Sequence, residues 1–114
     1  MKRGDVVLFP HPSGVRGKKR PAVILQSDAY TGKLRSVIVA EVTKNLTLAN
    51  DPACLFVDTS TQEGKATGLV RDSVVSCLVV VTVYADTIAQ VLGTLSPAMK
   101  QKLNDCLKTA LDLP

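Results

Sequence analysis

The stretch SVVSCLVVVTVY, residues Ser73–Tyr84, indicates the fold class, because its many valines favour an extended strand. The second half of this stretch is unusually apolar for a small protein. It therefore has to be covered by the core of the molecule, by a second subunit or by a bound peptide. The run is well short of the ~20 apolar residues that a membrane-spanning helix needs, and we expect no membrane association.

Shorter strands are predicted on the N-terminal side of this stretch, each bounded by turn-forming residues. Ser36–Thr43, SVIVAEVT, is rich in β-branched residues, and Ala22–Gln26 is apolar on both faces, which is typical of a central strand. The eight residues TQEGKATG, 61–68, are expected to form a turn. The remaining predicted strands are Asp5–Phe9, Cys54–Asp58 and a short one over Leu69–Asp72.

The C-terminal quarter changes from strand to helix periodicity. Asp86–Gly93 is expected to be a short helix that ends at its glycine. Ser96 and Pro97 have the residue types of an N-cap and a first helical position. The following apolar residues recur at steps of three and four and form one face: Met99, Leu103, Cys106, Leu107, Ala110 and Leu111. We expect one mainly β domain of the α+β class over 1–114, a small bent sheet or barrel with a C-terminal helix.

Composition excludes several classes of protein. Of the 114 residues, 46% are hydrophobic, which is typical of a globular chain, and 4% are aromatic, which argues against nucleic-acid binding on aromatic platforms. The three cysteines, Cys54, Cys77 and Cys106, form no CxxC pair and are expected to be buried free thiols in a reducing compartment. The N-terminus has no signal-peptide core, and the predicted location is the cytoplasm.

Four cations, Arg16, Lys18, Lys19 and Arg20, precede the central strand and end at Pro21. A residue before proline is held in extended geometry, so the Arg20 guanidinium is expected to have a stiff mount at the edge of an apolar body. A planar cation with five donors suits a phosphate group. The alternative is that the four cations form a solvated face without a ligand.

The chain resembles the MazF/PemK family of bacterial toxins in the segments KRGDVVLF, KKRPAVIL, VIVAEVT, GLVRDSVV and LSP, which occur in the family's order. The resemblance implies a small SH3-like β-barrel, a homodimer and a metal-independent endoribonuclease that acts on single-stranded RNA. It also implies a cognate antitoxin with an acidic, partly disordered tail as a partner. No metal or other cofactor is implied.

The family's active site uses the arginine before the strand proline and a threonine that ends the next long strand, and here these match Arg20 and Thr43. Attack by the RNA 2′-hydroxyl would give a 2′,3′-cyclic phosphate and a 5′-hydroxyl, with Arg20 stabilising the phosphorane. A pair of histidines cannot serve as acid and base, because His11 is the only histidine. The general base stays unassigned. Expected contacts to the RNA are Arg16, Lys18, Lys19, His11 and Glu41, the last sharing a strand face with Thr43.

Two other functions stay open at this point. Relatives on the same fold poison DNA gyrase without catalysis, and an SH3-like module that binds RNA or protein without turnover is a further alternative. The family often has a polar Gln-Leu-Arg-Thr type of stretch where this chain has Val79-Val80-Val81-Thr82. This replacement removes a cation that could contact RNA or a partner, so Val79 and Val81 bear on recognition, activity and dimerisation.

Overall fold

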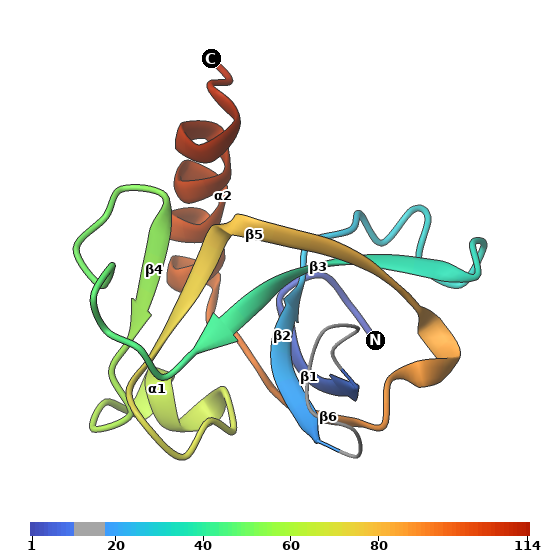
Figure 1. The fold of residues 1–114 in the computed structure, drawn as a ribbon, viewed down its shortest axis with the longest axis horizontal. Coiled ribbons are helices and arrows are strands. Elements are labelled where there is room, and N and C mark those ends of the chain that lie inside the picture. Colours follow the sequence, from blue (N-terminus) through green and yellow to red (C-terminus); the bar gives the residue numbers. More distant parts are fainter. Residues whose placement is uncertain (11–17) are drawn as a thin grey trace.

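One antiparallel sheet organises the chain, for which the computed structural model describes residues 1–10 and 18–114. The strands are neighbours in the order β4-β5-β3-β2-β1-β6, and the sheet curls into an open barrel (Figure 1). Their bounds are β1 Asp5–Pro10, β2 Lys19–Ile24, β3 Ser36–Thr43, β4 Cys54–Val57, β5 Ser73–Tyr84 and β6 Gln90–Thr94. The helices are α1 Gln62–Ala66 and α2 Pro97–Leu111, with a 3₁₀ turn at Ala85–Thr87.

The predicted fold class is confirmed, and the strands with the most β-branched residues were placed best. β3 and β5 have the predicted bounds, whereas β2 begins three residues before the predicted Ala22 and ends at Ile24. β5 is the longest strand, and it pairs with β4 through Ser73–Ser76 and with β3 on both sides of a register shift, through 74–76 and 80–84. β5 bends as it crosses the sheet, and this bend contributes to the curvature of the barrel (Figure 1).

Apolar side chains fill both sides of the curled sheet. One core layer lies between the sheet and α2, and Val23, Val42 and Leu103 belong to it. The other lies inside the curl and includes Phe9, Ala22, Ile24, Val37, Val39 and Val83. Strand alternation explains the division, since successive side chains of a strand point to opposite faces. In β3, Val37 and Val39 enter the inner layer, whereas Ala40 and Val42 enter the layer under α2.

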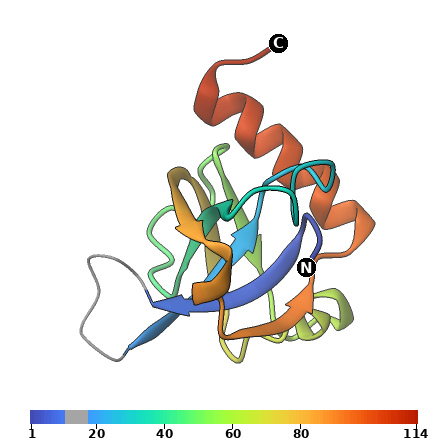
Figure 2. The same cartoon turned by 90° about the vertical axis from the view of Figure 1, so that its right-hand side faces the viewer.

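Helix α2 begins as the sequence predicts and covers one face of the sheet. The Ser96 hydroxyl accepts a hydrogen bond from the Met99 N–H at 3.1 Å, and Pro97 is the first helical residue. Met99, Leu103 and Cys106 are buried against β4 and β5. The predicted apolar face is wrong at Leu111, which is 58% exposed because the last turn of α2 extends past the edge of the sheet (Figure 2).

Three predictions of local structure are wrong. The predicted turn over 61–68 contains α1, because the Thr61 hydroxyl caps the Gly64 N–H, and Gly64 packs where a Cβ would lie 1.8 Å from the Asp58 carbonyl oxygen. Leu69–Asp72 forms no strand; the Asp72 carboxylate instead accepts bonds from the Thr59 N–H and hydroxyl. The secondary structure of short segments with polar caps is determined by tertiary contacts rather than by intrinsic propensity.

The predicted helix over Asp86–Gly93 is also wrong, because the second half of this segment completes the sheet. After the 3₁₀ turn the chain pairs with β1 as the edge strand β6, and the two strands lie side by side in Figure 2. Gly93 allows β6 to lie against α1, since a Cβ there would be 2.2 Å from the Ala66 carbonyl oxygen. Hydrogen bonding to β1 therefore outweighs the weak helical pattern.

The three cysteines are free and buried, as predicted. Burial raises the pKa of the Cys77 thiol to about 12, and the nearby Cys106 and Cys54 add to this effect. The pKa of Cys106 is also raised, chiefly by burial. The thiols of Cys77 and Cys106 are therefore neutral at physiological pH. Among the described residues, none of the helices has the length and apolar character required to cross a membrane.

Candidate active site

Arg20 and Thr43 lie on neighbouring strands, at the end of the sheet where β2 begins and β3 ends. The antiparallel pairing of β2 with β3 ends with Ala22 opposite Glu41, and Arg20 and Thr43 each lie two residues beyond that pair, at the same end of the sheet. Beyond the end of β3, β2 stays paired with β1, where Arg20 lies opposite Phe9. The Arg20 backbone is therefore held within a hairpin while its side chain is exposed.

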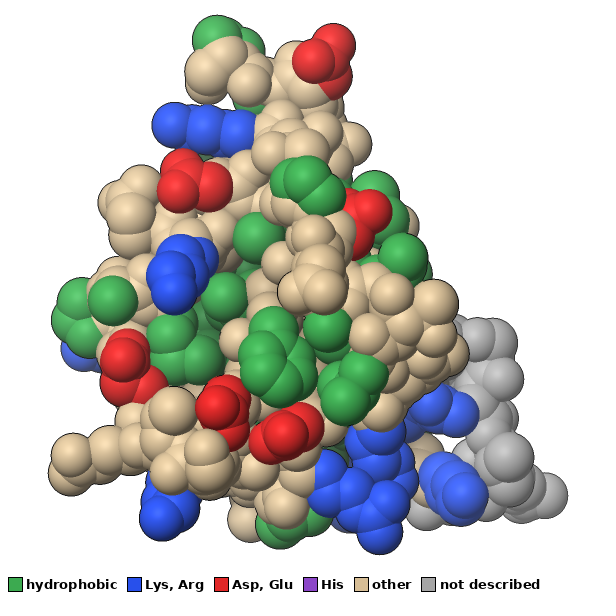
Figure 3. Space-filling view, turned by 90° about the vertical axis from the view of Figure 1, so that its left-hand side faces the viewer, with side chains coloured by type: hydrophobic (Ala, Val, Ile, Leu, Met, Phe, Trp, Pro, Cys, Tyr) green, Lys and Arg blue, Asp and Glu red, His purple; other side chains and the backbone are tan. Residues whose placement is uncertain are grey.

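A pocket of about 430 Å³ contains both residues. Among the described residues that line it, four are cations, Lys18, Lys19, Arg20 and Lys44, and none is acidic. Figure 3 shows lysine and arginine side chains gathered at one edge of the face that it presents. The other lining residues are Pro21, Val42, Thr43, Asn45 and Ser73. A concave surface with one sign of charge concentrates anions, so this pocket, which we call the cationic pocket, suits phosphate groups.

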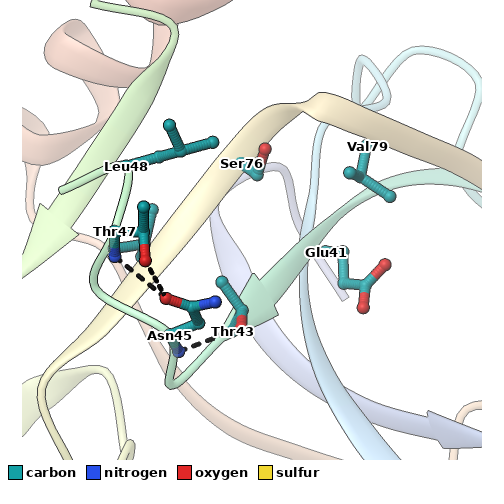
Figure 4. Close-up of a pocket in the computed structure, with 8 residues that line it drawn as sticks. Glu41, Thr43, Asn45, Thr47, Leu48, Ser76 and Val79 are labelled. Atoms are coloured by element: carbon teal, nitrogen blue, oxygen red, sulfur yellow. Dashed lines mark hydrogen bonds between the residues drawn. The ribbon is translucent and has the colours of Figure 1, made fainter. Parts of the chain in front are cut away.

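The Thr43 hydroxyl has a defined position in the cationic pocket. Its Oγ1 accepts a hydrogen bond from the Asn45 backbone N–H at 3.1 Å, which fixes the start of the loop after β3 (Figure 4). Because the hydroxyl accepts in this bond, its own proton can be donated to a ligand oxygen. Arg20 and Thr43 thus present donors to one shared space, an arrangement that can bind a phosphodiester.

A second pocket, which we call the side pocket, adjoins the first and shares Thr43 and Asn45 with it. It has a volume of about 250 Å³ and is lined also by Glu41, Thr47, Leu48, Val74, Ser76 and Val79 (Figure 4). The register between β3 and β5 slips here, since Ala40 pairs with Val80 and the next residue, Glu41, pairs with Ser76. The residues of β5 that this slip leaves unpaired with β3 make room for the hollow between Ser76 and Val79.

The structure brings together most of the residues predicted for RNA contact. Lys18 and Lys19 line the cationic pocket, and Glu41 lies in the side pocket with Thr43, as strand alternation predicts. His11 and Arg16 lie outside the described residues. The catalytic and binding roles of all these side chains stay predictions.

Sequence reasoning missed Lys44 and Asn45, which line the cationic pocket directly after Thr43. The sequence could have indicated both residues, because they follow a strand rich in β-branched residues, and residues that follow a strand lie at the edge of its sheet. Val79 was noted only as a departure from the family pattern. The structure places it in the wall of the side pocket, 41% exposed, while Val81 packs partly against the inner core layer.

No group of three or more His, Cys, Asp or Glu side chains within 1–10 and 18–114 is arranged to hold a metal ion. The absence of a metal from the reaction stays a prediction. The described polar side chains that line the cationic pocket are cations, hydroxyls and one amide, all of which can donate hydrogen bonds and stabilise negative charge.

Residues 2–111 match the family model described as PemK-like, MazF-like toxin of type II toxin–antitoxin system. The chain is 34% identical over 104 residues to Endoribonuclease MazF6 of Mycobacterium tuberculosis and to Endoribonuclease MazF2 of Mycobacterium bovis. Each alignment covers 90% of this chain and 87% of the relative. The similarity therefore extends over both pockets and both core layers.

Solved structures share the fold. The Mycobacterium tuberculosis toxin MazF-mt6 superposes with a TM-score of 0.76 at 25% identity, covering 98% of this chain and 99% of that one. A mycobacterial endoribonuclease in complex with its cognate antitoxin gives a TM-score of 0.82 at 23% identity, covering 100% and 97% of the two chains. The open barrel with a C-terminal helix is thus a fold that such toxins have.

Proposed function

The chain belongs to the PemK-like, MazF-like toxins of type II toxin–antitoxin systems, and we propose that it cleaves single-stranded RNA at the cationic pocket without a metal ion. The family and the endoribonuclease class predicted from the sequence agree with relatives that match nine-tenths of the chain. One observation supports the assignment of the proposed activity to particular residues. Arg20 and Thr43, on different strands, line one pocket whose charged side chains are all cations.

In the proposed reaction the RNA supplies its own nucleophile. The 2′-oxygen loses its proton and forms a bond to the adjacent phosphorus, and the bond from phosphorus to the 5′-oxygen breaks. The products are a 2′,3′-cyclic phosphate and a 5′-hydroxyl, the leaving oxygen having gained a proton. Negative charge builds on the non-bridging oxygens in the transition state, where fixed donors stabilise it more than in the ground state.

Arg20 and Thr43 have different parts in this reaction. The Arg20 guanidinium stays protonated, since arginine does not deprotonate in proteins, and donates hydrogen bonds to the phosphoryl oxygens and to the leaving 5′-oxygen. The proton that the 5′-oxygen gains is supplied by water. The Thr43 hydroxyl donates to a second phosphoryl oxygen from the opposite strand. Glu41, which lies two residues before Thr43 in β3, is a candidate contact to the ribose side of the RNA. The base that accepts the 2′-proton is left unassigned.

The other cations are proposed to bind the RNA backbone. Lys18, Lys19 and Lys44 are exposed around the cationic pocket, where each can neutralise a phosphate and release counterions. Arg16 and His11 remain predicted RNA contacts from the same part of the sequence. Binding should therefore weaken steeply as the salt concentration rises.

An antitoxin and a second copy of the chain are the proposed protein partners. A related endoribonuclease has been solved in complex with its cognate antitoxin. In this chain Leu78, Val79 and Val80 of β5 are 41–54% exposed, and Val79 lines the side pocket that adjoins the cationic pocket; this combination suits an acidic tail with apolar anchors. The proposed location is the cytoplasm, where RNA is available and free cysteines stay reduced.

The test is cleavage of single-stranded RNA in EDTA by the purified protein, with analysis of the product ends. The wild type should give 2′,3′-cyclic phosphate and 5′-hydroxyl ends, and Arg20→Ala should be slower by about 10²–10³-fold. Arg35→Ala, which removes an exposed arginine outside both pockets, is the matched control and should cut normally. Intact RNA with the wild type, or equal cutting by Arg20→Ala, would refute the proposal. Impaired gyrase supercoiling with intact RNA would favour the gyrase-poison alternative instead.

A further inference from the structure

The side pocket differs in chemistry from the cationic pocket that it adjoins. Within the part of the chain that the structure describes, four of the nine residues around the cationic pocket are lysine or arginine, whereas the charged residue that lines the side pocket is Glu41. A phosphate is therefore favoured in the first and disfavoured in the second. Leu48, Val74 and Val79 give the side pocket an apolar wall (Figure 4).

The size of the side pocket sets a limit on its ligand. Its volume of about 250 Å³ is below the ~300–1,000 Å³ typical of pockets for drug-sized ligands. One planar ring system fits such a volume with its faces against aliphatic side chains and its edge against polar groups. Because the two pockets share Thr43 and Asn45, one ligand can extend from one pocket into the other.

The orientation of the Asn45 side chain is fixed by Thr47. The Asn45 Oδ1 accepts hydrogen bonds from the Thr47 backbone N–H at 3.0 Å and from the Thr47 hydroxyl at 2.6 Å. An N–H can only donate, so the oxygen of the amide, not the nitrogen, has to face Thr47. The amide nitrogen consequently points away from Thr47, as Figure 4 shows, and Asn45 offers N–H donors to the pocket.

We infer that the side pocket holds one nucleobase of the RNA, next to the scissile phosphate, and that Asn45 is the residue that selects this base. The inference rests on the proposed function. The base lies against Val79, Val74 and Leu48, and the Asn45 amide donates to its edge. Sequence-specific recognition of single-stranded RNA works in this way, by an unstacked base in a pocket that reads its hydrogen-bonding edge.

The donor character of Asn45 gives the direction of selection. Uracil and guanine present a carbonyl oxygen where cytosine and adenine present an amino group. Since the Asn45 oxygen is occupied, its amide pairs with the carbonyl of uracil or guanine. Asn45→Asp keeps the shape and both bonds from Thr47 but replaces the N–H donors with an acceptor oxygen, which pairs with the amino group of cytosine or adenine.

The experiment uses a pool of RNA oligonucleotides with random bases around the cut, with sequencing of the products. The wild type should prefer uracil or guanine over cytosine or adenine by roughly five- to tenfold at one position that flanks the cut. Asn45→Asp should reverse the preference at that position and leave the others unchanged. Preferences that are the same in Asn45→Asp and in the wild type at every position would overturn the inference.

Thr47 is a positioning residue, and its variants test the orientation of Asn45 separately. Thr47→Val removes the hydroxyl bond and leaves the backbone bond, so the preference at the same position should fall by about half or more, whereas Thr47→Ser should restore it. Thr109→Val, on an exposed turn of α2, is the control for the same change of side chain. An unchanged base preference in Thr47→Val would contradict the positioning role of Thr47.

A binding measurement separates this inference from the proposed function. Oligonucleotides with a 2′-deoxy residue at the cut cannot react but can still bind, so affinity for each base can be compared in the wild type and in Asn45→Asp. If no RNA is ever cut but binding shows the reversal, the proposed cleavage fails and the base pocket stands. If RNA is cut but neither assay shows the reversal, the base pocket fails and the cleavage stands.

Discussion

The two faces of strand β3 are used differently. Ala40 and Val42 point into the core layer under α2 and are 0–3% exposed. The opposite face begins with Val37 and Val39 inside the curl and continues with Glu41 and Thr43, which line the two pockets. On one face of β3 the side chains therefore change from core residues to pocket-lining residues within a few positions. On the other face they remain core residues.

The difference arises from how far each covering layer extends. Helix α2 packs along β4 and β5 and covers its face of the sheet. The curl covers the opposite face only as far as Val39, because the pairing of β5 with β3 slips after Ala40. Where the inner cover ends, the strand ends of β2 and β3 carry Arg20 and Thr43 at the surface. The comparison predicts that substitutions under α2 change stability, whereas substitutions at the strand ends change RNA processing.

The largest effect is expected from Leu103→Ala in the middle of α2. Leu103 is fully buried, and truncating such a side chain leaves a cavity that lowers the free energy of unfolding by about 2–5 kcal/mol. Chemical denaturation measures the loss. Gln101→Ala on the exposed side of the same helix should change the free energy of unfolding by less than about 0.5 kcal/mol. Equal effects of the two variants would contradict the assignment of the buried face.

The next effect is a dependence of stability on alkaline pH. Burial raises the pKa of Cys77 from the ordinary 9.0 to about 12, so between these values the unfolded thiol ionises and the folded one stays protonated. The unfolded state then binds fewer protons, and stability falls as pH rises, by about 1.4 kcal/mol per pH unit from this group. Below pH 9 the contribution is constant.

Denaturation at pH 8.5, 9.5 and 10.5 checks this slope, with Cys77→Ala as the comparison. The variant is less stable at every pH because of the cavity, but its stability should fall less steeply above pH 9, with the raised pKa of Cys106 accounting for part of what remains. Parallel slopes for wild type and variant would mean that Cys77 ionises equally in both states.

The sequence predicts the strands of this fold better than its short connecting elements. β3 and β5 were placed at their bounds because β-branched residues prefer extended backbone locally. Helix α1 and strand β6 were missed because their formation depends on contact between them. Gly93 of β6 lies where a Cβ would meet the Ala66 carbonyl oxygen of α1, and Gly68, just after α1, lies where a Cβ would meet the Leu92 carbonyl oxygen of β6; such close packing leaves no periodic signal in the sequence.

The candidate site was predictable in part. Arg20 and Thr43 came from the family resemblance, and their meeting follows from the register of β2 and β3, which the sequence alone does not set. Lys44, Asn45 and the side pocket could not be predicted, because they depend on the loop after Thr43 and on the slipped pairing of β5. The residues of a site that lie on regular strands were thus easier to find than those on the irregular segments beside them.

On the pocket face, Thr43→Val should slow RNA cleavage by about tenfold. The variant keeps the β-branched shape and loses a hydrogen bond to a negatively charged phosphoryl oxygen, worth about 1.5 kcal/mol, which corresponds to about tenfold in rate. Single-turnover cleavage with excess protein measures the rate. Thr43→Ser retains the hydroxyl and should cut at nearly the wild-type rate. A Thr43→Ser variant as slow as Thr43→Val would indicate that the methyl group, not the hydroxyl, is what the site needs.

The smallest effect is expected from Lys44→Ala. This variant tests the difference between the two faces of β3, because it should change RNA binding without changing protein stability or the cleavage chemistry. Lys44 is exposed at the cationic pocket, so its loss should leave the free energy of unfolding almost unchanged. The slope of log affinity for a non-cleavable single-stranded RNA against log salt should become shallower by about 0.7, the value for one phosphate contact. Lys102→Ala, an equal change of charge on α2, should leave this slope as it is. If both lysines changed the slope equally, the RNA would follow the net charge of the protein rather than the cationic pocket, and the two faces of β3 would no longer differ in RNA binding.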